Sequence, residues 1–256
     1  MLKITVKRWL TACLITLALV LLAEAQSLSK AQAIRGQHAH RLKRRISRTV
    51  GAQYLLFLPE EYGRDRHRRW PLIMYLHGGS RRGNDIEKVR EYGLPALVEK
   101  DRSFPFIVVS PQCPEGEIWT DTETLIAILD EVSKHYAVDV SRVYLTGHSM
   151  GGRGTWYLAY KHPERFAAIA PMSGGPVIET WAARLKEMPV WVFHGAKDDL
   201  VPLSESETMV KALQALGNRR VKLTVYPDRD HFILDTYENM ELYTWFSQHQ
   251  KLLDQK

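Results

Sequence analysis

The feature that most constrains the fold is the alternation, from residue 51 onward, of short apolar runs with longer amphipathic segments. Several apolar runs are continuous, as expected for strands buried on both faces of a mostly parallel sheet. The predicted strands are AQYLLFL, PLIMYLH, FIVVSPQ, RVYLTG, FAAIAPM, VWVFHG and VKLTVYP, and the predicted helices lie near residues 86–100, 121–136, 152–162, 178–186, 204–216 and 236–249. This order predicts an α/β fold, with a mostly parallel central sheet and helices on both of its faces.

The first 25 residues have the layout of a secretory signal peptide. A basic start, MLKITVKRW, is followed by the apolar run 10–22 and by the small residues Ala23 and Ala25. A membrane anchor is the alternative, but this run has 13 residues, and a helix that spans a bilayer needs ~20. We expect cleavage near Ala25, export to the periplasm or the medium, and no membrane anchor on the mature chain.

Residues 26–50 form a basic lead-in to the predicted α/β domain, residues 51–256. Six Lys and Arg residues lie between positions 35 and 48, in a segment without aromatic residues. Binding to nucleic acid or to an anionic surface is the alternative, but we expect a solvated basic segment and no nucleic-acid partner. Loss of Cys13 with the signal peptide would leave Cys113 alone, so we expect no disulfide and a structural thiol.

The stretch LTGHSMGGRGTW, residues 145–156, places a serine among glycines directly after a predicted strand. Glycines lose the most conformational entropy on ordering, so local stability does not explain them. They suit a strained strand-to-helix turn that exposes the hydroxyl of Ser149 above the sheet. We therefore predict that Ser149 is a nucleophile, backed by the N-terminus of the following helix.

A serine nucleophile needs a base and a carboxylate that orients the base. Asp198 and Asp199 follow the strand VWVFHG, and His231 follows the last predicted strand. These positions lie just beyond the carboxyl ends of strands, where sites form in parallel sheets. The amides of Met150 and of Gly79, in the loop after PLIMYLH, are the predicted oxyanion hole.

With these residues assembled, the chain resembles an α/β-hydrolase, and in particular the secreted esterases grouped with dienelactone hydrolases, phospholipase/carboxylesterases and predicted peptidases of the prolyl-oligopeptidase clan. The matching segments are YLLFLPEEYG, PLIMYLHGGSRRGND, FIVVSPQCPEGEIW, DVSRVYLTGHSMGGRGTW, HPERFAAIAPMSGG, VWVFHGAKDDLVP and VKLTVYPDRDH. The family motif HGxxDxxVP implies Asp198 rather than Asp199 as the acid. One departure is that His231 follows Asp230, whereas the family usually has glycine there.

The resemblance implies a serine carboxylic-ester hydrolase that works through an acyl-enzyme and needs neither a cofactor nor a metal ion. About sixteen residues separate FAAIAPM from VWVFHG, enough for one helix but not for a cap domain. An open site favours short acyl esters, such as acetyl or feruloyl esters, on small or polysaccharide-linked alcohols. The alternatives are a serine peptidase of the prolyl-oligopeptidase clan and a non-catalytic binding protein on the same fold.

Three further residues are candidates for binding the substrate. Trp119 is expected by resemblance to line the cleft, His148 stands beside the nucleophile, and Trp181 lies on the helix that could overhang the site. Packing roles are the alternative for all three. His77 and His194 each precede a glycine at a strand end, so we expect structural roles for them.

Overall fold

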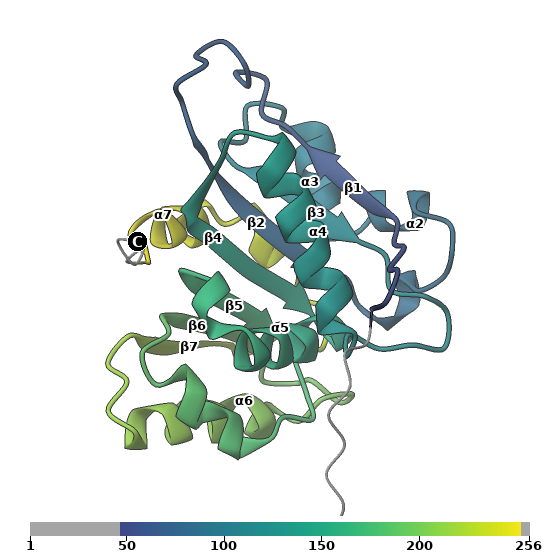
Figure 1. Cartoon of the computed structure of the whole chain (residues 1–256). Coiled ribbons are helices and arrows are strands. Elements are labelled where there is room, and N and C mark those ends of the chain that lie inside the picture. Colours follow the sequence, from purple (N-terminus) through teal and green to yellow (C-terminus); the bar gives the residue numbers. More distant parts are fainter. Residues whose placement is uncertain (1–46, 252–256) are drawn as a thin grey trace, which may run out of the picture. The chain divides into compact units, whose positions relative to one another are not determined.

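The computed structural model describes residues 47–251, and within these residues the strands form one seven-stranded sheet. The strands are β1 (Tyr54–Phe57), β2 (Trp70–Leu76), β3 (Ile107–Pro111), β4 (Val138–His148), β5 (Ala168–Met172), β6 (Val190–Gly195) and β7 (Val221–Tyr226). Their order across the sheet is β1-β3-β2-β4-β5-β6-β7 (Figure 1), and only β1 is antiparallel to its neighbour. The predicted fold class is confirmed. The predicted signal peptide and almost all of the basic lead-in lie outside the described residues.

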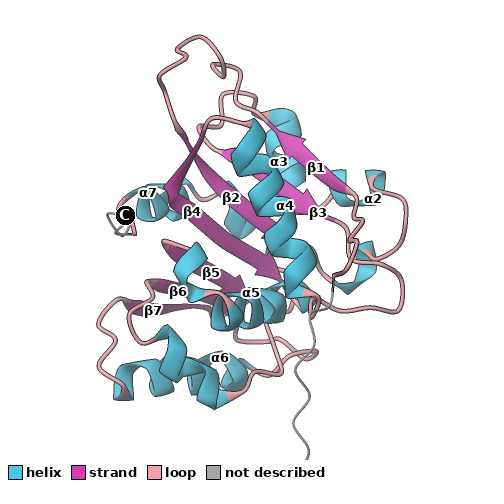
Figure 2. Cartoon of the chain, viewed as in Figure 1, coloured by secondary structure: helices cyan, strands magenta, loops and turns pink. Residues whose placement is uncertain are grey.

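Helices connect the strands and cover the sheet (Figure 2). The α-helices of the described residues are α2 (Glu87–Arg90), α3 (Leu94–Lys100), α4 (Thr122–His135), α5 (Met150–Lys161), α6 (Leu203–Ala215) and α7 (Met240–Ser247). The 3-10 helices are η1 (Gly79–Arg81), η2 (Pro163–Arg165), η3 (Glu179–Leu185) and η4 (Leu234–Glu238). Between β5 and β6 the chain forms only η3, as expected without a cap domain. None of the helices in residues 47–251 combines the length and the apolar character of a membrane span.

The core has two halves, one on each face of the sheet. Leu72, Met74 and Leu76 of β2 pack with residues of α4, α5 and α6, whereas Ile73 and Tyr75 pack with residues of α3 and α7. Alternate side chains of a strand point to opposite faces, so a strand that is apolar at every position contributes to both halves of the core.

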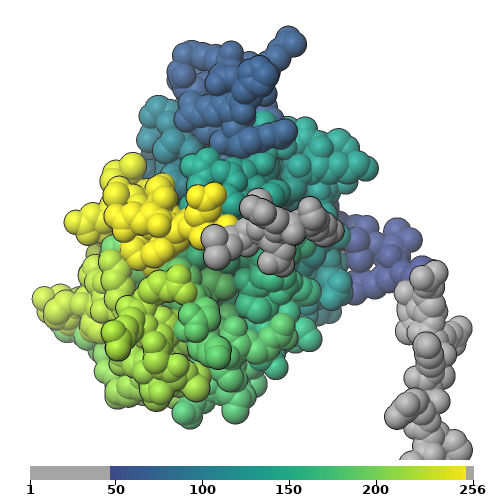
Figure 3. All heavy atoms as spheres, turned by 60° about the vertical axis from the view of Figure 1, so that its left-hand side comes forward, coloured from purple at the N-terminus to yellow at the C-terminus, as the bar shows by residue number. Residues whose placement is uncertain are grey.

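In Figure 3 the yellow C-terminal segment lies on the surface, below the blue segment and above the green ones.

Some helix predictions need correction. The helix expected over residues 86–100 is divided into α2 and α3 because Gly93 has a positive φ of 60°. A Cβ atom at Gly93 would lie 2.3 Å from the hydroxyl of Tyr75, so packing against β2 requires glycine there. The segment expected to be helical over 178–186 forms the 3-10 helix η3, and the one over 236–249 forms η4 and α7.

Ser204 and Glu207 have the spacing of a capping box, but Ser204 does not cap α6. The helix begins at Leu203, after Pro202, and no side chain caps it. Proline has no N–H and a fixed φ, which suits the start of a helix. The carboxylate of Glu205 instead accepts a hydrogen bond of 2.9 Å from the amide of Val177, which ties the loop after β5 to α6.

Candidate active site

Ser149 lies on a sharp turn between β4 and α5. Its φ of 58° and ψ of −119° fall in a region that residues other than glycine rarely adopt. The turn is held because the amide of Ser149 donates to the carbonyl of Met172 at 2.9 Å. A Cβ atom at Gly151 would lie 1.8 Å from the carbonyl oxygen of Leu76, and one at Gly152 would lie 2.3 Å from that of Met172. The glycines therefore let α5 begin against the backbones of β2 and β5.

The side chains of Ser149, His231 and Asp198 form an unbroken hydrogen-bonded chain. The hydroxyl of Ser149 lies 2.8 Å from Nε2 of His231, and Nδ1 of His231 lies 2.8 Å from Oδ2 of Asp198. The loops after β4, β7 and β6 supply these residues, as the sequence predicts. Asp199 is exposed and takes no part in this chain. In this arrangement Nδ1 of His231 donates to Asp198, and Nε2 can take the proton of the serine.

Asp198 is held ionised by hydrogen bonds. Its Oδ1 accepts from the amides of Leu200 at 3.0 Å and Val201 at 2.8 Å, and its side chain is fully buried. Burial by itself raises the pKa of this carboxyl, but the bonds from Val201, His231 and Leu200 outweigh burial, so the pKa is lowered from its ordinary value. The carboxylate of Asp198 therefore keeps its negative charge next to His231 although its side chain is buried.

His194 supports Asp198 from the other side. Its Nε2 lies 3.1 Å from Oδ2 of Asp198 and 2.9 Å from the carbonyl oxygen of Val201, while its Nδ1 lies 2.7 Å from the hydroxyl of Ser206. Because a carbonyl only accepts, Nε2 donates to Val201, and Nδ1 forms the hydrogen bond with Ser206. His194 thus has a structural role, as predicted, and this role includes holding the side chain of Asp198. The link to Ser206 on α6 was not predicted from the sequence.

His148 does not line a cleft, and the expectation that it binds substrate needs correction. The side chain is buried; its Nε2 donates to the carbonyl of His231 at 2.7 Å, and its Nδ1 lies 2.9 Å from the hydroxyl of Tyr92. His148 therefore ties the loop of His231 to the turn that carries Ser149. No local pattern in the sequence predicts this contact, because Tyr92 is 56 residues away from His148.

The two tryptophans expected at the cleft are also buried. Trp119 is 5% exposed and packs against Gly154, and its indole N–H donates to the carbonyl of His77 at 2.9 Å. Trp181 is 5% exposed, and its ring stacks on that of Tyr160 at 5.6 Å. Both tryptophans pack inside the protein, which leaves them little surface for a substrate.

The candidate oxyanion loop, residues 77–79, follows β2. Gly79 and Met150 are the first residues of η1 and α5, where amides have no acceptor within their own helix. Leu76 at the end of β2 pairs with Gly147 of β4, so the two turns are neighbours. A Cβ atom at Gly78 would lie 3.5 Å from the carbonyl oxygen of His148, which confirms their close approach.

Side chains hold all three carbonyl groups of this loop. Trp119 donates to the carbonyl of His77, Nδ1 of His77 donates to that of Gly78 at 2.7 Å, and Nε of Arg82 donates to that of Gly79 at 3.1 Å. Each peptide plane is thereby fixed, so its N–H is fixed as well. This is the preorganisation that an oxyanion hole requires.

Cys113 also contacts this loop, through its backbone. Its amide donates to Nε2 of His77 at 3.0 Å, and its side chain is buried. Burial raises the pKa of the thiol to about 11, so the thiolate form needed for nucleophilic attack is scarce near neutral pH. These observations favour the structural thiol. Within residues 47–251, no group of three or more His, Cys, Asp or Glu side chains is placed to hold a metal ion.

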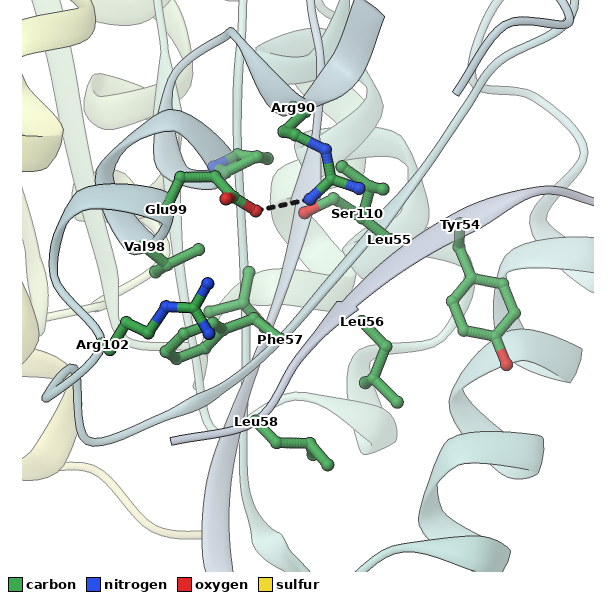
Figure 4. A pocket seen from close by; sticks show the side chains of 12 residues that line it. Tyr54, Leu55, Leu56, Phe57, Leu58, Arg90, Val98, Glu99, Arg102 and Ser110 are labelled. Carbon is green, nitrogen blue, oxygen red and sulfur yellow. Dashed lines mark hydrogen bonds and ion pairs between the residues drawn. The ribbon is translucent and has the colours of Figure 1, made fainter. Parts of the chain in front are cut away.

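A separate hollow lies beside the edge strand β1 (Figure 4). Its volume is about 380 Å³, and its lining includes Leu55, Phe57 and Ser110 together with the ion pair of Arg90 and Glu99. Strands β3 and β2 separate β1 from β4, which leads to Ser149. The hollow contains none of the candidate active-site residues.

The buried histidines predict that stability falls in mild acid. Burial lowers the pKa of His77 and His148 from 6.5 to about 4. Between these values the unfolded chain binds protons that the folded chain does not, so the free energy of unfolding falls as the pH falls. From pH 7.5 to 5 we expect a loss of about 2 kcal/mol from each histidine.

Urea unfolding at the two pH values measures this loss. His148→Gln should reduce the pH dependence, whereas His67→Gln is the control because His67 is exposed. A free energy of unfolding that does not change between pH 7.5 and 5 would show that these histidines are not held neutral by the fold.

Comparison with known proteins identifies relatives of this chain. The family model "Dienelactone hydrolase family" matches residues 30–251. The bifunctional acetylxylan esterase/xylanase XynS20E of Neocallimastix patriciarum is 30% identical over 184 residues, which cover 68% of this chain and 26% of that protein. The probable feruloyl esterase C of Aspergillus terreus is 31% identical over 164 residues, 60% of this chain and 57% of that protein. The chain therefore spans only about a quarter and just over half of these two relatives.

Among solved structures, a thermostable esterase superposes with a TM-score of 0.67 and 30% sequence identity, covering 77% of this chain and 59% of the other. Together with the seven-stranded sheet, this likeness confirms the α/β-hydrolase fold.

Proposed function

The chain belongs to the dienelactone hydrolase family, and on that premise we propose that it is a serine carboxylesterase. The observation that carries the proposal is the hydrogen-bonded chain from Ser149 through His231 to the buried carboxylate of Asp198. The hydroxyl of a free serine is a weak nucleophile, and a base within hydrogen-bond distance activates it. A binding protein without catalytic function would not need this chain to be complete.

In the proposed reaction, the hydroxyl oxygen of Ser149 attacks the carbonyl carbon of the ester while Nε2 of His231 takes the proton. Asp198 holds the imidazole in the correct tautomer and stabilises the imidazolium that forms. The alkoxide of the tetrahedral intermediate accepts hydrogen bonds from the amides of Met150 and Gly79. His231 then gives its proton to the leaving alcohol.

Water completes the cycle. His231, now neutral, takes a proton from a water molecule as the water attacks the acyl-enzyme, and the same amides hold the second oxyanion. Ser149 leaves with the proton that His231 returns, and the carboxylic acid is released. Loss of one oxyanion donor typically lowers the rate by about 10²- to 10³-fold, and the hydrogen bonds that hold the three carbonyl groups of the 77–79 loop support this role for the loop.

The proposed substrates are esters of short or aromatic acids, such as acetyl or feruloyl esters, on small or polysaccharide-linked alcohols. The names of the two esterase relatives support this class, and the short connection between β5 and β6 supports an open site. The signal-peptide pattern of residues 1–25 supports export, which would bring polymer-linked esters outside the cell within reach.

The experiment that tests this proposal compares esters with a peptide. The mature chain is assayed with 4-nitrophenyl esters of increasing acyl length and with a chromogenic peptide. Turnover of esters with the peptide left intact supports the esterase. Cleavage of the peptide with little ester hydrolysis would indicate the serine peptidase instead, and no turnover of either would favour a binding protein.

A further inference from the structure

The loops around the candidate active site expose large apolar side chains. Ile178, Leu200 and Phe232, which we call the apolar rim, are 52%, 63% and 56% exposed. They lie on the loops that follow β5, β6 and β7, which are adjacent strands of the sheet. Because these strands are parallel, their carboxyl ends meet at the edge that also carries Ser149.

The loops that carry the apolar rim contact one another, so they lie side by side along this edge. A Cβ atom at Gly175, in the loop of Ile178, would lie 2.8 Å from the side chain of Val201 in the loop of Leu200. The amide of Lys197, in the latter loop, donates to the carbonyl of Arg229 in the loop of Phe232 at 2.9 Å.

Phe232 is the member of the apolar rim whose ring contacts the candidate base, His231. Its ring centroid lies 5.4 Å from that of His231, with the two planes at 83°, and 6.2 Å from that of His148. Nε2 of His231 lies 2.8 Å from the hydroxyl of Ser149, so Phe232 contacts the same imidazole that contacts the candidate nucleophile. A substrate group that lay against this face of His231 would contact the phenyl ring.

The loop holds Phe232 in this exposed position. The amide of Phe232 donates to Oδ1 of Asp230 at 2.9 Å, and the carbonyl of Phe232 accepts from the guanidinium of Arg229 at 3.1 Å. That guanidinium also pairs with the carboxylate of Asp235. The next residue, Ile233, is completely buried and anchors the loop. Asp230, which stands where the family usually has glycine, thus helps to hold the ring of Phe232 in its exposed position.

The two cations in the loops of Leu200 and Phe232 are paired with carboxylates. Lys197 pairs with Asp228, and Arg229 pairs with Asp235. The exposed carboxylate of Asp199 lies beside Leu200 in the chain, and that of Asp230 lies beside His231. A neutral apolar group fits these surroundings, and an aromatic one can pack edge-to-face or offset on Phe232.

We propose that Phe232 is a specificity-determining residue that binds a neutral aromatic acyl group, with Leu200 and Ile178 bordering the same group. This inference rests on the proposed esterase function and selects, within its substrate class, arylacyl esters over acetyl esters. We expect a higher kcat/KM for arylacyl esters than for acetyl esters, because the ring of Phe232 contacts the acyl group when its carbonyl carbon lies at Ser149.

The test measures kcat/KM for methyl cinnamate and methyl acetate by titrating the acid released, because these esters share an alcohol that has no ring. Phe232→Ala should lower the cinnamate-to-acetate ratio by about 10- to 100-fold, and Phe232→Leu, which keeps apolar bulk, should lower it less. Leu216→Ala is the matched control. Leu216 is also exposed, but it follows α6 and precedes β7, so it lies near the amino ends of the strands, away from Ser149.

A fall in the Phe232→Ala ratio together with an unchanged Leu216→Ala ratio supports the inference. An unchanged ratio in Phe232→Ala overturns it, including the case in which both rates fall equally, because Phe232 would then only hold His231 in place. If the unaltered chain hydrolyses neither these esters nor any 4-nitrophenyl ester, the proposed function itself fails, and this inference with it.

Discussion

Replacing Asp198 by asparagine is expected to lower kcat for ester hydrolysis by about 10⁴-fold. Asp198 accepts hydrogen bonds from His231, Leu200 and Val201, and Nε2 of His194 also faces it. An asparagine amide places an NH₂ group where only acceptors fit, so it favours the wrong tautomer of His231 and removes the charge that stabilises the imidazolium. Single-turnover kinetics with a 4-nitrophenyl ester measures the loss.

Asp199→Asn is the matched control, since it changes the same side chain one position along the chain. Asp199 is exposed, so kcat should stay within about twofold of the original value, as for most surface changes. A greater loss for Asp199→Asn than for Asp198→Asn would mean that the acid has been assigned to the wrong residue.

Gly151→Ala is expected to destabilise the fold by about 3 kcal/mol or more and to lower activity with it. The new Cβ atom would lie 1.8 Å from the carbonyl oxygen of Leu76 and 2.9 Å from that of His77. Both contacts are with backbone, so no side chain can move aside. Relief requires α5 to shift away from β2, which would separate the amide of Met150 from that of Gly79. Urea unfolding measures the stability, and ester hydrolysis measures the alignment.

Gly51→Ala is the control for this substitution. A Cβ atom at Gly51 would meet nothing within 4 Å, so we expect a change below about 0.5 kcal/mol. Equal stability of the two alanine variants would show that α5 does not depend on the close approach at Gly151.

The sequence was most informative where one local pattern carries one physical requirement. Apolar runs predicted all seven strands, and the runs were continuous for strands such as β3 and β6, which are buried at every position. The glycines around Ser149 predicted the turn, because only glycine allows backbones to approach as closely as at Gly151. Ser149, Asp198 and His231 could be placed because each follows a strand, and the structure brings the three into hydrogen-bond contact. Their catalytic roles stay predictions.

The sequence was least informative about the direction in which a side chain points. Trp119 and Trp181 were expected at a cleft, yet both are buried, because a tryptophan near a strand end suits either place. The contact between Tyr92 and His148 joins residues 56 positions apart, and that between Arg82 and the carbonyl of Glu117 joins residues 35 apart. Such contacts depend on tertiary packing, which no local spacing encodes.

The central claim is that Ser149 is an activated nucleophile, and covalent labelling tests it most directly. A fluorophosphonate probe phosphonylates an activated serine with loss of fluoride, and mass spectrometry of the digested protein locates the added group. We predict one label per chain, on the peptide that contains Ser149, with no label in Ser149→Ala and slow labelling in Asp198→Asn. A natively folded chain that takes up no label, or takes it up at another serine, would contradict the claim.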